Sequence, residues 1–87
     1  MTVILFPKLE SWNDSSKVAT IAASVDKERV LCRISLTILR NKFGALEDHP
    51  MRSISQHRLV IQDAARKLIE KEAFEDDGSI MIRSVDI

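Results

Sequence analysis

The sequence contains few of the residues on which specialised small proteins depend. Its 87 residues include one cysteine, two glycines and no tyrosine. The single cysteine, Cys32, excludes a disulfide framework within the chain. Gly44 and Gly78 are too few for a glycine-rich phosphate loop, and no G-x-S-x-G sequence is present. The common kinds of nucleotide-dependent enzyme are therefore excluded.

Long apolar runs are also missing. The apolar stretch at residues 3–6 is far too short for the core of a signal peptide or for a membrane-spanning helix. A composition with 45% apolar and 30% charged residues is typical of a soluble globular domain, and we expect a reducing, cytoplasmic setting. The chain is predicted to form a single domain, residues 1–87, with a thin core. A homodimer is therefore expected.

Charge of one sign does not dominate, because the formal net charge is +0. No overall attraction to nucleic acid or anionic lipid is implied. Residues 27–46 hold five basic residues against one acidic residue, a balance of +4, whereas residues 74–87 hold four acidic against one basic, a balance of −3. Both segments fit ordinary solvated surface. The alternative is that they meet, within one chain or across a dimer.

Three strands are predicted in the first half of the chain. Residues 3–6 form a short strand, which Pro7 limits to an edge because proline lacks a backbone N–H. The turn-rich stretch 11–17 (SWNDSSK) is predicted to be a loop from which Trp12 covers the core. Residues 18–25 and 29–35 alternate apolar and polar side chains, as half-buried strands do.

The last two of these strands are expected to pair as a hairpin. Their apolar side chains share one face only if Ile21 pairs with Cys32 or with a neighbour of the same parity. A two-residue turn at Asp26 and Lys27 gives this register, and so does a four-residue loop. Lys27 is poorly suited to the positive φ of a two-residue turn, so the loop length stays open.

Two helices follow the hairpin. Ser35 is suited to cap a short helix at residues 36–43, which Gly44 ends. After a link at residues 45–49, a long amphipathic helix is predicted from Pro50 to about residue 73.

The long helix has one apolar side, with a polar side opposite. A capping box at Ser53 and Gln56 offers an alternative start about one turn later. The predicted apolar side carries Ile54, Ile61, Ala65 and Leu68.

An acidic turn at residues 75–78 and a closing strand at residues 80–85 complete the chain. The order is therefore β-β-β-α-α-β, in which strands and helices are grouped and do not alternate. This order predicts an α+β fold with a small antiparallel sheet and two helices packed on one face.

Candidate metal ligands are few. Cys32, His49 and His57 have acids near them in sequence at Glu47 and Asp48, but no H-x-x-x-H or C-x-x-C pair occurs. Cys32 lies on the inward side of its strand and is expected to be an inert core residue. We therefore predict no metal, no cofactor and no catalytic residues.

A candidate basic patch consists of Arg29, Arg33, Arg40 and Lys42. The first two are expected on the outer face of the sheet and the other two beyond it, where all four could contact phosphates. The sequence lacks the aromatic platform of a sheet that binds single-stranded nucleic acid. Nucleic acid is therefore an unfavoured partner.

His57 and Arg58 break the pattern of the long helix. At 100° per residue they flank the centre of its apolar side by roughly 60° each. A buried guanidinium must be paired. Arg58 is therefore either a structural anchor to a carboxylate or to backbone carbonyls, which we prefer, or part of an interface or anion site with His57.

Short motifs spread along the chain together resemble one family. They are Phe6-Pro7, Val25-Asp26, Val30-x-Cys32-x-Ile34-Ser35, Leu39, His57-Arg58-x-x-Ile61 with Ala65, and Arg83-Ser84 with Asp86 after an acidic turn. The chain resembles domain-of-unknown-function family 1488, short bacterial conserved hypothetical proteins. It departs from the resemblance at Lys27, where glycine is expected after the turn aspartate. The resemblance implies a bacterial cytoplasmic origin and a small α+β domain, and it brings no activity, cofactor or catalytic residue.

These observations favour a non-catalytic interaction module that binds itself or another protein, because the core is thin and edge strands are available. A nucleic-acid-binding regulator that uses the candidate basic patch is the alternative. An enzyme ranks third, because it would need a pocket built from His57, Arg58 and distant acids. No membrane partner is expected.

Overall fold

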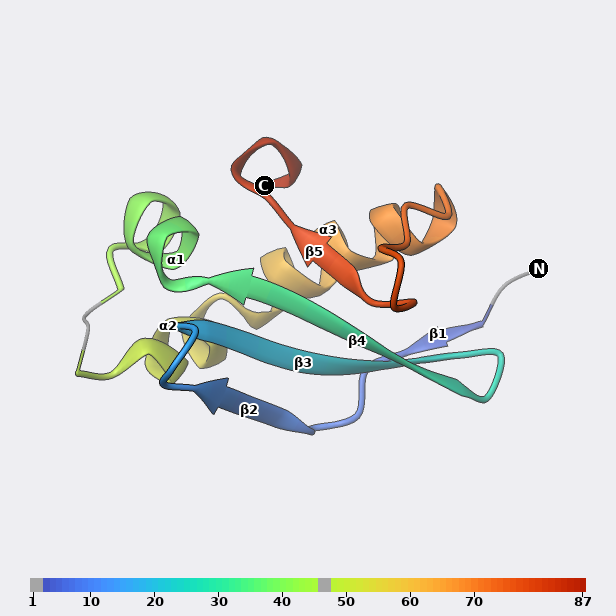
Figure 1. Ribbon diagram of the computed structural model, residues 1–87, viewed down its shortest axis with the longest axis horizontal. Coiled ribbons are helices and arrows are strands. Elements are labelled where there is room, and N and C mark those ends of the chain that lie inside the picture. Colours follow the sequence, from blue (N-terminus) through green and yellow to red (C-terminus); the bar gives the residue numbers. More distant parts are fainter. Residues whose placement is uncertain (1–2, 46–47) are drawn as a thin grey trace.

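The computed structural model describes residues 3–45 and 48–87 and has an α+β fold, as predicted. The strands form one sheet in the order β1-β3-β4-β5, and β2 also pairs with β3. Helices α2 and α3 lie on one side of this sheet, behind it in Figure 1. The elements are β1 (Ile4–Leu5), β2 (Glu10–Asn13), β3 (Val18–Val25), β4 (Glu28–Ser35), α1 (Leu36–Phe43), α2 (Pro50–Gln56), α3 (Arg58–Glu70), β5 (Ile80–Ile82) and the 3-10 turn η1 (Ser84–Asp86).

The hairpin of β3 and β4 is the centre of the sheet. Ile21 pairs with Cys32, as the alternation of apolar residues predicts. The turn has two residues, Asp26 and Lys27, whose φ angles of 50° and 74° are both in the left-handed region. This is the geometry of the two-residue turn that matches the twist of a hairpin. The open question of loop length is thus settled in favour of the short turn, with a lysine where glycine would be less strained.

The outer edge beside β3 is built from two short strands. Ile4 of β1 pairs with Val25, whereas Glu10 of β2 pairs with Ile21, so the register shifts by two residues between them. Pro7 lies in this interruption, where its carbonyl accepts a bond of 2.8 Å from the amide of Leu9. An edge strand tolerates such a break because only one of its sides is paired.

The prediction of a loop at residues 11–17 was wrong in its first half. Residues 10–13 form β2, and Trp12 packs against the core from this strand. The turn begins after Asn13, whose side-chain oxygen accepts bonds from the amides of Ser15 and Ser16. Turn-forming residues therefore occupy the end of the strand and the turn, and pairing with β3 extends the strand to Asn13.

The closing strand corrects the prediction of an all-antiparallel sheet. β5 pairs with β4 in the parallel direction, with Ile80 beside Cys32 and Ile82 beside Ile34. Helices connect β4 to β5, and such a crossover returns the chain to the starting end of the first strand. β5 is also shorter than predicted, because it ends at Ile82 and the chain turns into η1.

The first helix agrees with its prediction. The side chain of its N-cap residue Ser35 accepts a bond of 3.3 Å from the amide of Ile38, and Gly44 ends the helix with φ of 66°. The long helix does not, because His57 leaves the helical conformation with φ of −118° and divides it into α2 and α3. α2 starts at Pro50, so the alternative start at Ser53 is not used.

α3 ends at Glu70, three residues earlier than predicted. Glu72 adopts φ of 57°, the amide of Ala73 donates to the carbonyl of Leu68, and that of Glu72 donates to the carbonyl of Ile69. These two bonds form the motif with which many helices stop at a left-handed residue. Glu72 fills the position that glycine usually takes.

The core lies between the sheet and the helices. Ile34, Leu39, Ile54, Ile61, Ile80 and Ile82 are fully buried there. The predicted apolar side of the long helix is confirmed for Ile54, Ile61 and Ala65, and Leu68 is half-buried. Within the described ranges, no helix has the length and apolar character needed to cross a bilayer.

Candidate functional site

The face of the sheet opposite α2 and α3 has exposed apolar side chains at its centre. Side chains alternate along a strand, so Ala22 and Ser24 of β3 point away from the core that Ile21 and Ala23 enter. Residues in register share a face, which places Leu31 beside Ala22 and Leu5 beside Ser24. Leu5 is 61% exposed and Leu31 is 38% exposed. Ala22 is only 4% exposed although it is outside the core cluster, so its neighbours on this face cover it.

A hollow of about 800 Å³ opens at the hairpin end of this face. Its lining comes from β1 and the residues after it, from β3 and from the hairpin turn and β4: Leu5, Phe6, Pro7, Ala23, Ser24, Lys27 and Arg29. Glu28 points to the other face, since it directly precedes Arg29 in β4 and pairs with Val25. Neither cation has an ion pair with any residue that the structure describes. The lining of the hollow therefore combines apolar side chains with two cations.

The structure does not bring the four residues of the candidate basic patch together. Arg29 lies near the hairpin turn, and Arg33 lies four residues further along β4 on the same face. Arg40 and Lys42 are in the last turn of α1, which lies at the opposite end of the sheet from the hairpin turn (Figure 1). A single row of phosphate contacts would have to follow the full length of β4.

Arg33 is engaged by the acidic turn before β5. Its guanidinium lies 3.1 Å from the carboxylate of Asp77. Asp77 also accepts bonds of 2.6 Å and 3.0 Å from the hydroxyl and the amide of Ser79. These bonds from Ser79, followed by Arg33, lower the pKa of Asp77 to about 2. The basic and acidic segments thus meet within one chain through this ion pair.

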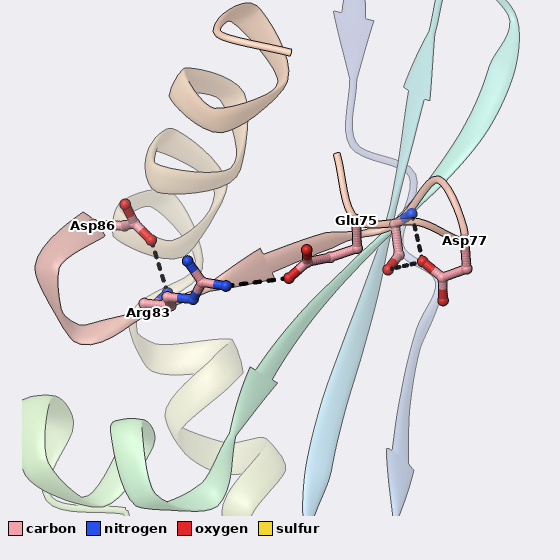
Figure 2. Close-up of polar contacts among 5 residues, drawn as sticks. Glu75, Asp77, Arg83 and Asp86 are labelled. Atoms are coloured by element: carbon pink, nitrogen blue, oxygen red, sulfur yellow. Dashed lines mark hydrogen bonds and ion pairs between the residues drawn. The ribbon is translucent and has the colours of Figure 1, made fainter. Parts of the chain in front are cut away.

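A second arginine, Arg83, links the acidic turn before β5 to η1 after it. Figure 2 shows the guanidinium of Arg83 directed at Glu75, 3.3 Å away, while the carboxylate of Asp86 accepts a bond of 2.8 Å from the backbone amide of Arg83. Both contacts are exposed, so each contributes little to stability. Together they fix the shape of the segment that follows α3.

Arg58 lies against the edge strand and forms an ion pair with two hydrogen bonds to Glu10. Its Nε and Nη2 atoms each donate a bond of 2.9 Å to the carboxylate of Glu10. This contact agrees with the preferred prediction of a structural anchor to a carboxylate, although Arg58 is only partly buried: its side chain is 32% exposed and that of Glu10 is 19% exposed. The predicted direction of the Arg58 side chain assumed one continuous helix. The break at His57 changes this direction. The two-pronged geometry is that of an anchor between α3 and β2.

His57 lies at the break between α2 and α3 and contacts the first helix. Its ring stacks on the ring of Phe43, with centroids 4.4 Å apart and planes 16° apart. Phe43 is the last residue of α1, so the stacked pair joins the end of α1 to the break between α2 and α3. His57 and Arg58 therefore contact different elements and do not form one site.

Sequence reasoning missed the partners Glu10 and Asp77. Glu10 and Trp12 are two residues apart, and this spacing would have placed both on one face of a strand had β2 been recognised. Asp77 precedes Ser79 by two residues, which is the spacing of a carboxylate that caps its own turn. Its contact with Arg33 joins residues 44 positions apart, so no local sequence pattern predicts it.

The candidate metal ligands are not gathered. Among the described residues, no three histidine, cysteine or acidic side chains lie close enough to share an ion. Cys32 is fully buried, and burial raises the pKa of its thiol to about 11, so the thiolate is disfavoured. His49 and Asp48 are exposed beside the start of α2. Glu47 lies outside the described residues.

Comparison with known proteins identifies the family of the fold. Residues 4–82 match the family described as "Protein of unknown function (DUF1488)". The chain belongs to the DUF1488 family. It is 29% identical over 80 residues to the "Uncharacterized protein YrdB" of Escherichia coli (strain K12), which covers 91% of this chain and 94% of that protein. The protein of the same description from Shigella flexneri has the same identity and coverage.

A crystal structure of a DUF1488 protein of unknown function from Shewanella loihica PV-4 has the same fold. Its TM-score is 0.83 at 24% identity, and the match covers 91% of this chain and 90% of that chain. The DUF1488 resemblance seen in the sequence motifs is therefore confirmed. The family carries no assigned activity, so the function of this chain has to be argued from its own surfaces.

Proposed function

We propose that this DUF1488 chain is a non-catalytic protein-interaction module of the cytoplasm and that the uncovered face of its sheet is the binding surface. The observation that carries this proposal is the group of apolar side chains at the centre of that face. Single exposed apolar residues are common, but Ala22 and Leu31 are paired in the strand register, and Leu5 pairs with Ser24, two residues along β3 on the same face. A continuous apolar area flanked by charge is the composition of a protein interface.

The first partner that we propose is a second copy of the chain. A domain of 87 residues buries a smaller share of its surface than larger domains do, so burying one more face gives a large relative gain. The proposal that the module is non-catalytic is supported by two side chains. The thiol of Cys32 is buried with a raised pKa, and the guanidinium of Arg58 is occupied by Glu10.

The test uses two leucines that are exposed on different surfaces. Leu31→Glu places a charge at the centre of the uncovered sheet face, and Leu59→Glu makes the same change on α3, where Leu59 is 82% exposed. We expect Leu31→Glu to run as a monomer in size exclusion with light scattering and Leu59→Glu to keep the mass of the parent. Circular dichroism checks that both variants are folded.

Two results would contradict the proposal. If Leu59→Glu abolished association and Leu31→Glu did not, the interface would be on the helical side. If DNA or RNA bound at about 150 mM salt and lost affinity steeply with added salt, the nucleic-acid alternative would replace it. The basic side chains would then have to act from opposite ends of β4.

A further inference from the structure

The segment after α3 presents an apolar side chain between acids. Phe74 is 41% exposed and lies two residues after the left-handed residue Glu72. Glu72 and Asp76 flank it, and neither has an ion pair with any described residue. Glu75 is instead held by Arg83 (Figure 2), and Asp77 is held by Arg33. We define Glu72, Phe74 and Asp76 as the acidic knob.

The hollow at the hairpin end has the opposite character. Leu5, Phe6 and Pro7 offer apolar surface to one aromatic ring, and Lys27 and Arg29 supply two positive charges without an ion pair in the described part of the chain. Two unpaired cations beside apolar side chains match two unpaired carboxylates beside a phenyl ring. Complementary charge of this kind selects partner and orientation.

Resting on the proposed self-association, we propose that the acidic knob of one copy docks into the hairpin hollow of a second copy. The hairpin turn and the loop after α3 both lie toward the same end of the molecule, on the right in Figure 1. A two-fold axis through this end makes both contacts at once. In such a dimer each knob fills the partner's hollow, as a two-fold interface requires of any pair of unlike patches.

Ion pairs within the chain hold the backbone next to the acidic knob in place. Asp77 is anchored to Ser79 and Arg33, and Glu75 is anchored to Arg83, so the backbone on the C-terminal side of Phe74 is fixed. On its N-terminal side the bonds of Ala73 and Glu72 to the end of α3 fix the backbone as well. A preorganised knob loses little conformational entropy on binding.

Charge reversal tests the contact. Variant one carries Lys27→Glu with Arg29→Glu, and variant two carries Glu72→Lys with Asp76→Lys. Each variant alone places like charges in both contacts of the dimer, so we expect the dissociation constant to rise at least about a hundredfold. A one-to-one mixture pairs an acidic hollow with a basic knob and a native hollow with a native knob. We expect the mixture to regain a mass of about twice 9.9 kDa by light scattering.

Phe74→Ser provides a second reading that does not depend on charge. It should weaken the dimer at unchanged helix content, and a matched Leu59→Ser change at another exposed apolar residue, at the start of α3, should not. The proposal is overturned if the two charge variants remain dimeric alone or if their mixture stays monomeric. If that happens while Leu31→Glu still dissociates the dimer, self-association through the sheet face stands and only this contact fails. A parent that is monomeric at every concentration removes both.

Discussion

The two faces of the β3–β4 hairpin differ in what they contact, although the same two strands form both. On one face Ile21, Cys32 and Ile34 are buried under the helices. On the other face Ala22 is covered only by its neighbours, and Leu31 remains exposed. The covered face uses apolar side chains to hold the fold together. The uncovered face keeps apolar side chains that the monomer does not need, which is why we assign it to binding.

The largest difference between the faces should appear when one side chain is truncated on each. Ile34→Ala removes a fully buried side chain and leaves a cavity, so we expect it to lower the free energy of unfolding by about 2–5 kcal/mol. Leu31→Ala should lower it by less than about 1 kcal/mol, because part of the side chain is already in water. Urea melts at low protein concentration measure both, so that association does not contribute. Equal losses would contradict the assignment of the two faces.

The ion pair between Arg58 and Glu10 should give the next largest effect. Arg58→Ala leaves the carboxylate of Glu10, only 19% exposed, without its partner, and we expect a loss of about 2 kcal/mol. Arg66→Ala is the matched control, because Arg66 is about half exposed and lies 3.6 Å from Asp63 on the surface of α3. It should cost less than about 0.5 kcal/mol. Urea melts with unchanged m-values test the pair, and a parent-like Arg58→Ala would show that this guanidinium is free to bind.

A smaller effect of opposite sign is expected at the hairpin turn. Lys27 has φ of 74°, and glycine adopts this conformation without the penalty that a side chain brings. We expect Lys27→Gly to raise the free energy of unfolding by about 0.5–1 kcal/mol and yet to weaken the dimer, because it removes one cation from the hollow. Lys27→Ala is the control that removes the charge without relieving the backbone. If both variants changed stability equally, strain at this turn would not be the cause.

Sequence patterns predicted those parts of the fold that local chemistry decides. The period of two in β3 and β4 gave the pairing of Ile21 with Cys32, and Ser35 and Gly44 gave the bounds of α1. The position of Pro50 likewise located the start of α2. Each of these depends on residues close together in the chain, whose conformational preferences act before the rest of the molecule is assembled.

Long-range contacts decided what the patterns missed. The parallel direction of β5 depends on how the helices cross the sheet, and the break at His57 accompanies its stacking on Phe43. The partners of Arg33 and Arg58 are 44 and 48 residues away in the chain. Local sequence therefore does not predict the partners of the candidate site residues, and the hollow at the hairpin end depends on β1 lying beside β3.

The mass of the unmodified chain in solution tests self-association most directly. Size exclusion with light scattering, run over a hundredfold range of concentration around the micromolar level, should give about twice 9.9 kDa at the upper end and a shift toward the monomer on dilution. A mass of 9.9 kDa across the whole range would contradict the account, because the apolar side chains of the uncovered face would then remain in water.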